Sequence, residues 1–214
     1  MDDLGFSLNV GVIGLGHIGR IHIAAIEATQ YLSLAGLCDK NPDEAALAPE
    51  GGPFFHNSDA LLAKSDLDVV IIATPNSTHG KIAIDVIRRG RSVIIEKPAA
   101  GSVDELDQLM AEAERAGVYV YFAFHAAFAN EVVWFRRWMA NEGSKLGRIT
   151  GFHCSFYDPY IQANGTLISH AESLGNCWID SGVNALSVLN EFVELDLMKP
   201  AGIRFSYRPE KNTW

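Results

Sequence analysis

Three glycines near the start of the chain have a spacing that suits phosphate binding. Gly14, Gly16 and Gly19 follow the apolar run 8–13 and precede a stretch with apolar residues at helical spacing. In a strand-to-helix turn, the first glycine permits the tight turn, the second lets the backbone approach a pyrophosphate, and the third lets helix and strand pack closely. The helix N-terminus adds unpaired N–H groups. An ordinary strand-to-helix turn is the alternative for such a triplet taken alone.

An acidic residue further on favours the phosphate-binding interpretation. Asp39 closes the apolar run 32–38, about twenty residues after the glycines, where dinucleotide-binding proteins place the acid that binds the ribose. A carboxylate suits the ribose hydroxyls of NAD and repels the 2′-phosphate of NADP. We therefore predict NAD as the cofactor, with Lys40 alongside leaving NADP as the alternative, and we place His17 and Ile18 at the cofactor as residues of the helix start.

Lys97 is the residue best placed for proton transfer. It stands directly after the strand-like run 92–95 and is followed by Pro98, which restricts the backbone and aims the lysine into the crevice. An amine next to a bound nicotinamide can take or give a proton, as general acid–base catalysis requires. The alternative is a surface ion pair between Lys97 and Glu96.

The elements that must position these residues form a repeating pattern. Strand-like runs alternate with helical ones, and the unbroken apolar run 68–73 is typical of a strand buried on both faces of a parallel sheet. A capping-box start at 102–105 opens a helix that ends at Gly117. This alternation predicts an α/β fold, a doubly wound parallel sheet of the Rossmann type, over residues 1–122.

Ligands bind such a sheet beyond the carboxyl ends of its strands. We therefore expect the polar residues at these points to converge with the glycine turn: Thr74, Asn76, Glu96, Lys97 and His125.

The pattern changes from residue 123 onward. Residues 130–141 are predicted to form a helix, 148–157 alternates like a strand, 177–192 is a second helix and 203–207 a further strand. The predicted buried side of the first helix consists of Val132, Val133, Phe135, Trp138 and Met139. Two strands are too few for a stable sheet. Residues 123–214 are thus predicted to be a smaller, incomplete α+β domain, because the chain is a fragment or because another subunit completes the sheet.

Composition excludes several classes of function. The 214 residues are 48% hydrophobic, and 17 basic against 26 acidic side chains give a formal charge of −9. That charge repels nucleic acids and anionic membrane surfaces. The start is acidic, no apolar run is long enough to span a bilayer, and Cys38, Cys154 and Cys177 lack metal-site spacing. We expect a cytoplasmic protein without a metal site.

Four segments resemble the Gfo/Idh/MocA family of NAD(P)-dependent oxidoreductases in order and spacing. They are GVIGLGHIGR at 11–20, ATPNSTH at 73–79, EKP at 96–98 and DSGVNAL at 180–186. The resemblance implies a Rossmann domain and an α+β domain, with a sugar or cyclitol bound between them and a homo-oligomer formed through the second domain's sheet. It also implies cofactor contacts at the matching positions: Thr74, Asn76, His79, Glu96 and Lys97.

By the same resemblance, Lys97, Asp180 and Asn184 occupy the catalytic positions. Asp180 and Asn184 are four residues apart and share one helix face. On the residues alone, Asp180 would be a helix N-cap and Asn184 an exposed polar position. Asparagine stands where the family commonly has histidine, and it cannot shuttle a proton. Acid–base work therefore falls on Lys97, with Asp180 holding or tuning it and Asn184 hydrogen-bonding the reacting hydroxyl.

The DSGVNAL segment resembles that of the aldose 1-dehydrogenases, which implies oxidation of the anomeric hydroxyl of a sugar such as galactose or arabinose to the lactone. The expected substrate contacts are Lys97, His125, Asp158, Asp180 and Asn184. Two alternatives stay open. One is a non-catalytic sensor of dinucleotide and sugar on the same fold, and the other is an inactive fragment.

Overall fold

The computed structural model describes residues 6–49, 52–64, 66–147, 149–156, 178–195, 199 and 201–202. The chain divides into two compact units, Met1–Ala123 and Phe124–Trp214. Each unit has its own internal architecture. No helix in the described ranges is long and apolar enough to cross a membrane.

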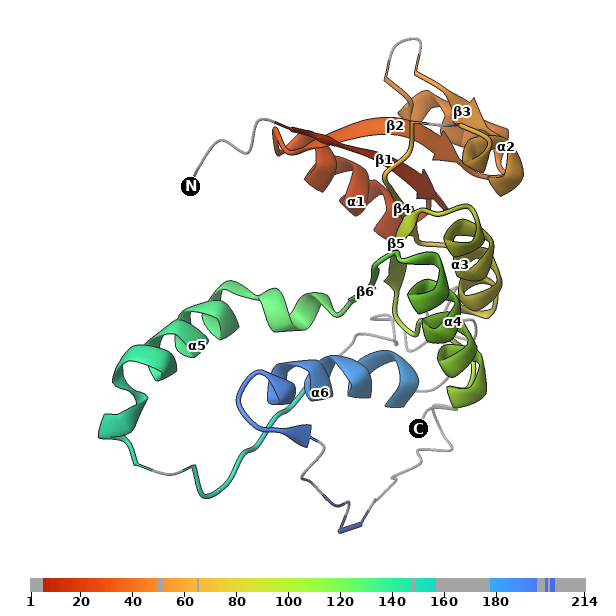
Figure 1. The fold of residues 1–214 in the computed structure, drawn as a ribbon. Coiled ribbons are helices and arrows are strands. Elements are labelled where there is room, and N and C mark those ends of the chain that lie inside the picture. The colour runs from red at the N-terminus through yellow and green to blue at the C-terminus, as the bar shows by residue number, and fades with distance from the viewer. Residues whose placement is uncertain are drawn as a thin grey trace, which may run out of the picture. The chain divides into compact units, whose positions relative to one another are not determined.

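The first unit is built on a six-stranded sheet in which all strands run parallel. The strands are β1 (Leu8–Ile13), β2 (Leu32–Cys38), β3 (Phe54–Phe55), β4 (Val69–Ile72), β5 (Ser92–Glu96) and β6 (Val120–Ala123). Their order in the sheet is β3-β2-β1-β4-β5-β6 (Figure 1). The strand order reverses between β1 and β4, which is the arrangement of a Rossmann fold.

Helices cover both faces of this sheet. The helical elements are α1 (His17–Glu27), the 3₁₀ turn η1 (Pro42–Leu47), α2 (Ser58–Leu62), the 3₁₀ turn η2 (Asn76–Thr78), α3 (His79–Arg88) and α4 (Val103–Ala116). Ile23 and Ile26 of α1 pack on one face with Val12 and Ile71. Residues of α2, α3 and α4 form the larger core on the other face (Figure 1).

Local sequence signals set the ends of these helices. The Ser102 hydroxyl accepts a hydrogen bond from the Glu105 backbone N–H at 3.2 Å and opens α4, as the predicted capping box requires. The Glu105 carboxylate accepts from Gly101 instead of closing the box on Ser102. Gly117 ends α4 with φ of +66°, a conformation that favours glycine.

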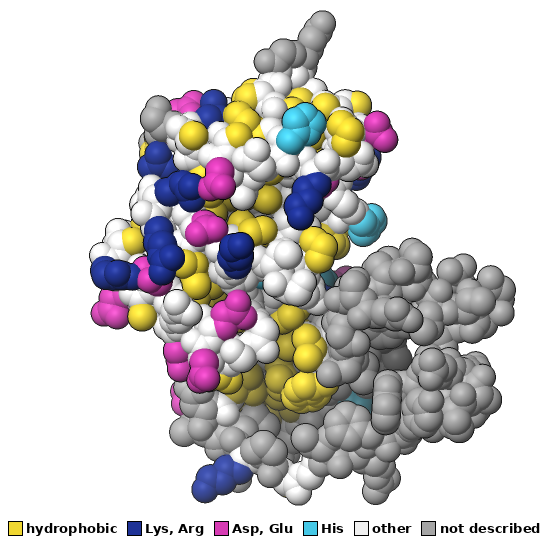
Figure 2. Space-filling view, turned by 90° about the vertical axis from the view of Figure 1, so that its right-hand side faces the viewer, with side chains coloured by type: hydrophobic (Ala, Val, Ile, Leu, Met, Phe, Trp, Pro, Cys, Tyr) yellow, Lys and Arg dark blue, Asp and Glu magenta, His cyan; other side chains and the backbone are white. Residues whose placement is uncertain are grey.

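The outer face of α2, α3 and α4 is charged and mixed in sign. Figure 2 shows Lys and Arg interspersed with Asp and Glu over this face. Arg88 of α3 pairs with Glu112 of α4 at 3.0 Å, and Arg89 pairs with Asp59 of α2 at 2.6 Å. Such exposed pairs contribute at most about 1 kcal/mol each. The apolar cores beneath them therefore carry the stability of the layer.

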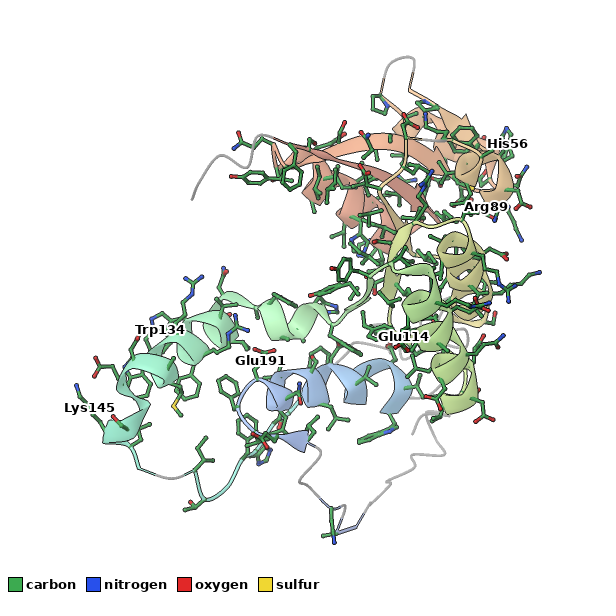
Figure 3. The ribbon with its side chains drawn as sticks, viewed as in Figure 1. His56, Arg89, Glu114, Trp134, Lys145 and Glu191 are labelled. Carbon is green, nitrogen blue, oxygen red and sulfur yellow. The ribbon has the colours of Figure 1, made fainter. Side chains whose placement is uncertain are left out.

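The described part of the second unit is helical. It contains the 3₁₀ turn η3 (His125–Phe128), α5 (Asn130–Glu142), the 3₁₀ turn η4 (Gly143–Lys145), a π-helical turn η6 (Trp178–Gly182) and α6 (Val183–Asn190). An ion pair between Arg136 and Glu191 joins α5 to the end of α6 (Figure 3). The rings of Phe135 and Phe192 are 5.2 Å apart beside it. The five apolar residues predicted for the inner side of α5 are all half-buried.

Two sequence-based predictions for this unit need correction. Residues 149–156 form no strand, because an alternating pattern makes a strand only where a partner strand pairs with it, and no described residue does so. The predicted helix 177–192 begins as the π-helical turn Trp178–Gly182 and continues as α6. The predicted loop 158–175 and strand 203–207 lie outside the described residues.

Candidate dinucleotide-binding and catalytic site

The glycine turn fits tightly against its own sheet. Gly14 has φ of +91°, and a Cβ added there would lie 2.6 Å from the backbone of Ala73 at the end of β4. A Cβ on Gly19 would lie 2.0 Å from the Gly14 carbonyl oxygen. Both positions therefore exclude any side chain, which is the packing that the spacing predicts.

Gly16 faces open space instead. A Cβ there would meet nothing within 4 Å, and Gly16, His17 and Ile18 are exposed. Gly16 caps α1 without a side-chain hydrogen bond. An uncapped helix start behind an open glycine leaves backbone N–H groups for an anion. The turn therefore fits the pyrophosphate of a dinucleotide.

Asp39 holds the turn from the end of β2. Its carboxylate accepts hydrogen bonds from the backbone N–H of Leu15 at 2.7 Å and of Asn41 at 2.9 Å. Each carboxylate oxygen keeps a second acceptor site, which suits the two hydroxyls of a ribose. Arg20 donates to the Leu15 carbonyl and pairs with Glu44 at 2.5 Å, so this cation is already neutralised. Lys40 is exposed. The arrangement fits NAD.

The Cys38 thiol, next to Asp39 in the chain, is unreactive. Burial raises the pKa of the Cys38 thiol to about 11, and the neighbouring Asp39 charge adds to the rise. Cys38 is 3% exposed and packs in the core on the α2–α4 face. It therefore stays a neutral, packed thiol at physiological pH.

Lys97 emerges from β5 in a segment that is anchored by its neighbour. The Glu96 carboxylate lies 2.8 Å from Nε2 of His22 on α1, and it accepts the Lys97 backbone N–H at 3.3 Å. The side chains of Glu96 and His22 are 12% and 21% exposed. Glu96 is thus part of a partly buried network and not of a loose surface pair. Lys97 itself is half-buried, and its peptide bond to Pro98 is cis.

The turn after β4 is tied to the same segment. His79 is 1% exposed, and its ring nitrogens lie 2.7 Å from the carbonyl oxygens of Thr74 and Pro98. Both nitrogens are therefore used inside the protein, which argues against the expected contact of His79 with the cofactor. Thr74 and Asn76 are half-buried at this edge. The turn carrying Thr74 and the Glu96–Pro98 segment meet through the ring.

The carboxyl edge of the sheet thus gathers most of the predicted cofactor residues. Gly14 abuts Ala73, Leu15 contacts Asp39, and His79 links the ends of β4 and β5. The residue that sequence reasoning passed over is His22, whose contact with Glu96 spans 74 positions in the chain. No local pattern signals a contact of that range.

The second unit holds the other two predicted catalytic residues. Asp180 and Asn184 are 5% and 1% exposed, and the Asn184 amide donates to the Asp180 carbonyl oxygen at 3.3 Å. Asp180 lies inside the π-helical turn and not at an N-cap, and Asn184 is not an exposed polar residue. The π-helical turn needs a glycine at position 182, because a Cβ there would lie 2.8 Å from the Trp178 ring.

Asn184 has an unusual feature. Its Oδ1 is buried and has no hydrogen-bond partner in the described structure. A buried acceptor without a donor costs about 1–3 kcal/mol. Such an atom is suited to accept a hydrogen bond from a ligand hydroxyl.

The remaining predicted site residues are less informative. His125 is exposed at the start of η3 and belongs to the second unit. Asp158 lies outside the described residues. Among the residues that the structure describes, no group of three or more His, Cys, Asp or Glu side chains could hold a metal ion.

The sheet order, the glycine turn and Asp39 together define a dinucleotide-binding Rossmann domain. Residues 8–124 match the family described as "Oxidoreductase family, NAD-binding Rossmann fold", Gfo/Idh/MocA. The chain belongs to this family, and its first unit is the family's NAD-binding domain.

Several curated relatives are named as dehydrogenases of a sugar derivative or of inositol. The chain is 26% identical to the rhizopine catabolism protein MocA of Rhizobium meliloti over 82% of this chain and 54% of that protein. It is 30% identical to glucose-6-phosphate 3-dehydrogenase of Bacillus subtilis over 69% of this chain and 41% of that protein. It is 38% identical to UDP-N-acetylglucosamine 3-dehydrogenase of Acidithiobacillus ferrooxidans over 50% of this chain and 34% of that protein.

Solved structures agree with the fold. GenD2 from gentamicin A biosynthesis, in complex with NAD, is 25% identical with a TM-score of 0.72, over 86% of this chain and 54% of that one. Scyllo-inositol dehydrogenase from Lactobacillus casei, with bound NAD(H) and scyllo-inositol, is 20% identical with a TM-score of 0.73, over 87% of this chain and 56% of that one. The chain spans about half, or less, of the length of the curated relatives named above.

Two glycine substitutions should separate ligand binding from packing. Gly16→Ala adds a methyl group in open space, so we expect the free energy of unfolding to change by less than about 1 kcal/mol and the affinity for NADH to fall roughly tenfold. Gly19→Ala forces a clash and should cost about 1–3 kcal/mol of stability or more. Denaturant titration and NADH fluorescence measure the two quantities. Unchanged NADH affinity in Gly16→Ala would remove this turn from the binding site.

Proposed function

We propose that this protein is an NAD-dependent dehydrogenase that oxidises a hydroxyl group of a sugar or cyclitol. One observation carries the proposal. Lys97 follows β5 at the carboxyl edge of the sheet that also carries the glycine turn and Asp39, in a segment anchored on both sides by partly buried contacts. In a doubly wound sheet this edge is where a dinucleotide lies, so a lysine fixed there is within the reaction region.

The proposed chemistry divides simply between cofactor and protein. When bound, NAD accepts a hydride from the carbon that carries the reacting hydroxyl. The neutral amine of Lys97 accepts the hydroxyl proton, so the C–H and O–H bonds break and a C=O bond forms. Asn184 accepts a hydrogen bond from a substrate hydroxyl through its unpartnered Oδ1. Asp180, buried one helical turn earlier, holds or tunes the lysine, as the resemblance to the family implies.

For the substrate, we propose the anomeric hydroxyl of an aldose such as galactose or arabinose, with a lactone as the product. The support is the sequence Asp180-Ser-Gly-Val-Asn184-Ala-Leu, with asparagine in place of the family's common histidine. Relatives that act at position 3 of a sugar, or on inositols, define the competing substrates. His125 and Asp158 remain our candidates for contacts with further sugar hydroxyls.

The test is the formation of reduced nicotinamide when the protein, with NAD or NADP, meets a panel of aldoses, sugar phosphates, nucleotide sugars and inositols. We expect turnover with NAD, and we expect Lys97→Ala to lower kcat about 100-fold or more while the Kd for NADH changes little. Lys81→Ala, an exposed lysine on α3, is the matched control. Binding of NADH without turnover of any substrate would refute the dehydrogenase proposal and favour a sensor.

Asn184→Leu tests the second unit. Leucine removes a buried acceptor that has no partner, and it also removes the 3.3 Å hydrogen bond from the Asn184 amide to the Asp180 carbonyl oxygen. These two effects oppose each other, so the free energy of unfolding should change by less than about 1–3 kcal/mol. If Asn184 binds the substrate, the KM for the sugar should rise at least tenfold while NADH affinity is retained. Asn190→Leu, the same change at an exposed position of α6, is the control. An unchanged KM would assign Asn184 no part in binding.

We also propose that the second unit forms the contact of a homo-oligomer. Several large apolar side chains of this unit are exposed: Phe128, Trp134, Leu146 and Trp178 at 55%, 64%, 65% and 51%. Trp134 lies on α5 (Figure 3). Light scattering should give at least twice the monomer mass of 23.4 kDa, and Trp134→Glu should lower it. A monodisperse monomer at micromolar concentration would contradict this proposal.

A further inference from the structure

His79 is the most deeply buried titratable side chain at the carboxyl edge of the sheet. It is the first residue of α3 and is 1% exposed. Nδ1 lies 2.7 Å from the carbonyl oxygen of Pro98, and Nε2 lies 2.7 Å from the carbonyl oxygen of Thr74. The ring thus bridges the turn after β4 and the segment after β5.

The two partners determine the chemical form of the ring. A carbonyl oxygen only accepts hydrogen bonds, whereas a neutral imidazole has one N–H donor and one acceptor nitrogen. In the neutral form, one nitrogen lone pair would face a carbonyl oxygen at 2.7 Å, which is repulsive. Both contacts are hydrogen bonds only when both nitrogens carry a proton. Hydrogen bonds of this charged form are about twice as strong as neutral ones.

A carboxylate lies next to the same helix end. The Glu105 side chain of α4 approaches Gly80 so closely that a Cβ there would lie 2.2 Å from its Oε1. Glu105 also accepts the Gly101 N–H at 2.7 Å. The Glu105 carboxylate therefore lies beside the residue that follows His79 at the start of α3.

His79 holds the backbone of the residue after Lys97, and His22 holds the side chain of the residue before it. Pro98, directly after Lys97, is held through its carbonyl by His79 on α3. Glu96, directly before Lys97, is held through its carboxylate by His22 on α1. The two helices lie on opposite faces of the sheet, so the segment is secured from both sides.

We propose that His79 is a positioning residue that acts as a donor at both ring nitrogens, tying the turn after β4 to the segment 96–98 and thereby placing Lys97. Only the expected effect on kcat rests on the proposed function. The protonation state and the anchoring are properties of the protein by itself.

The first measurement is the ¹⁵N NMR spectrum of the histidine side chains at pH 7 in the wild-type protein, with His79 assigned by its absence in His79→Gln. We expect both nitrogens of His79 to be protonated. A lone-pair nitrogen in that ring at pH 7 would overturn the proposal. His79→Gln is needed only for the assignment, and the protonation state is read from the wild-type protein.

The second measurement is hydrogen exchange and kinetics in His79→Phe, which keeps a ring without donors, and in His79→Gln, which keeps one donor group. His56→Gln, an exposed histidine, is the control. In His79→Phe we expect faster amide exchange at residues 96, 97 and 99 and a kcat about 10- to 100-fold lower, with little change in the KM for NAD. The effect should be smaller in His79→Gln. Unchanged exchange and kcat in a folded His79→Phe would refute the positioning role. If the wild-type protein shows no turnover but His79→Phe still exchanges its amides faster, the proposed function is refuted and the anchoring role of His79 stands.

Discussion

The all-parallel sheet is the constraint on which the rest of the first unit depends. A parallel sheet needs crossover helices between its strands, and these must bury both of its faces. The described faces of the sheet are apolar, with Val70, Ile72, Val93 and Ile95 on one face and Val12 on the other. Polar chemistry is therefore confined to the strand ends. Because every strand points the same way, those ends meet along one edge.

The sequence predicts this arrangement well where backbone geometry restricts the residue type. Gly14 and Gly19 are forced by contacts below 3 Å, and Gly117 by a positive φ, so their spacing indicates a turn or a helix end directly. The unbroken apolar run at β4 and the position of Asp39 after β2 likewise follow from burial and from strand length. At these positions the neighbouring residues alone determine the local structure, so the local sequence pattern is enough to predict it.

The predictions that fail depend on distant partners. Residues 149–156 alternate like a strand, but alternation does not supply the neighbouring strand. The polarity of Asn184 suggests exposure, yet its side chain is 1% exposed in α6, directly after the π-helical turn. The cofactor contact predicted for His79 stays a prediction, but the motif gives no sign that its ring lies against two carbonyl oxygens 5 and 19 positions away in the chain. None of these outcomes can be read from neighbouring residues.

The protonated, buried Cys38 has a consequence for how this protein withstands oxidative stress. Sulfenic acid formation and alkylation both begin from an exposed thiolate. With its pKa raised to about 11 and 3% of its surface accessible, Cys38 presents neither charge nor access. At the end of β2, among the described residues, a peroxide or electrophile therefore meets the Asp39 carboxylate and a protonated, buried thiol.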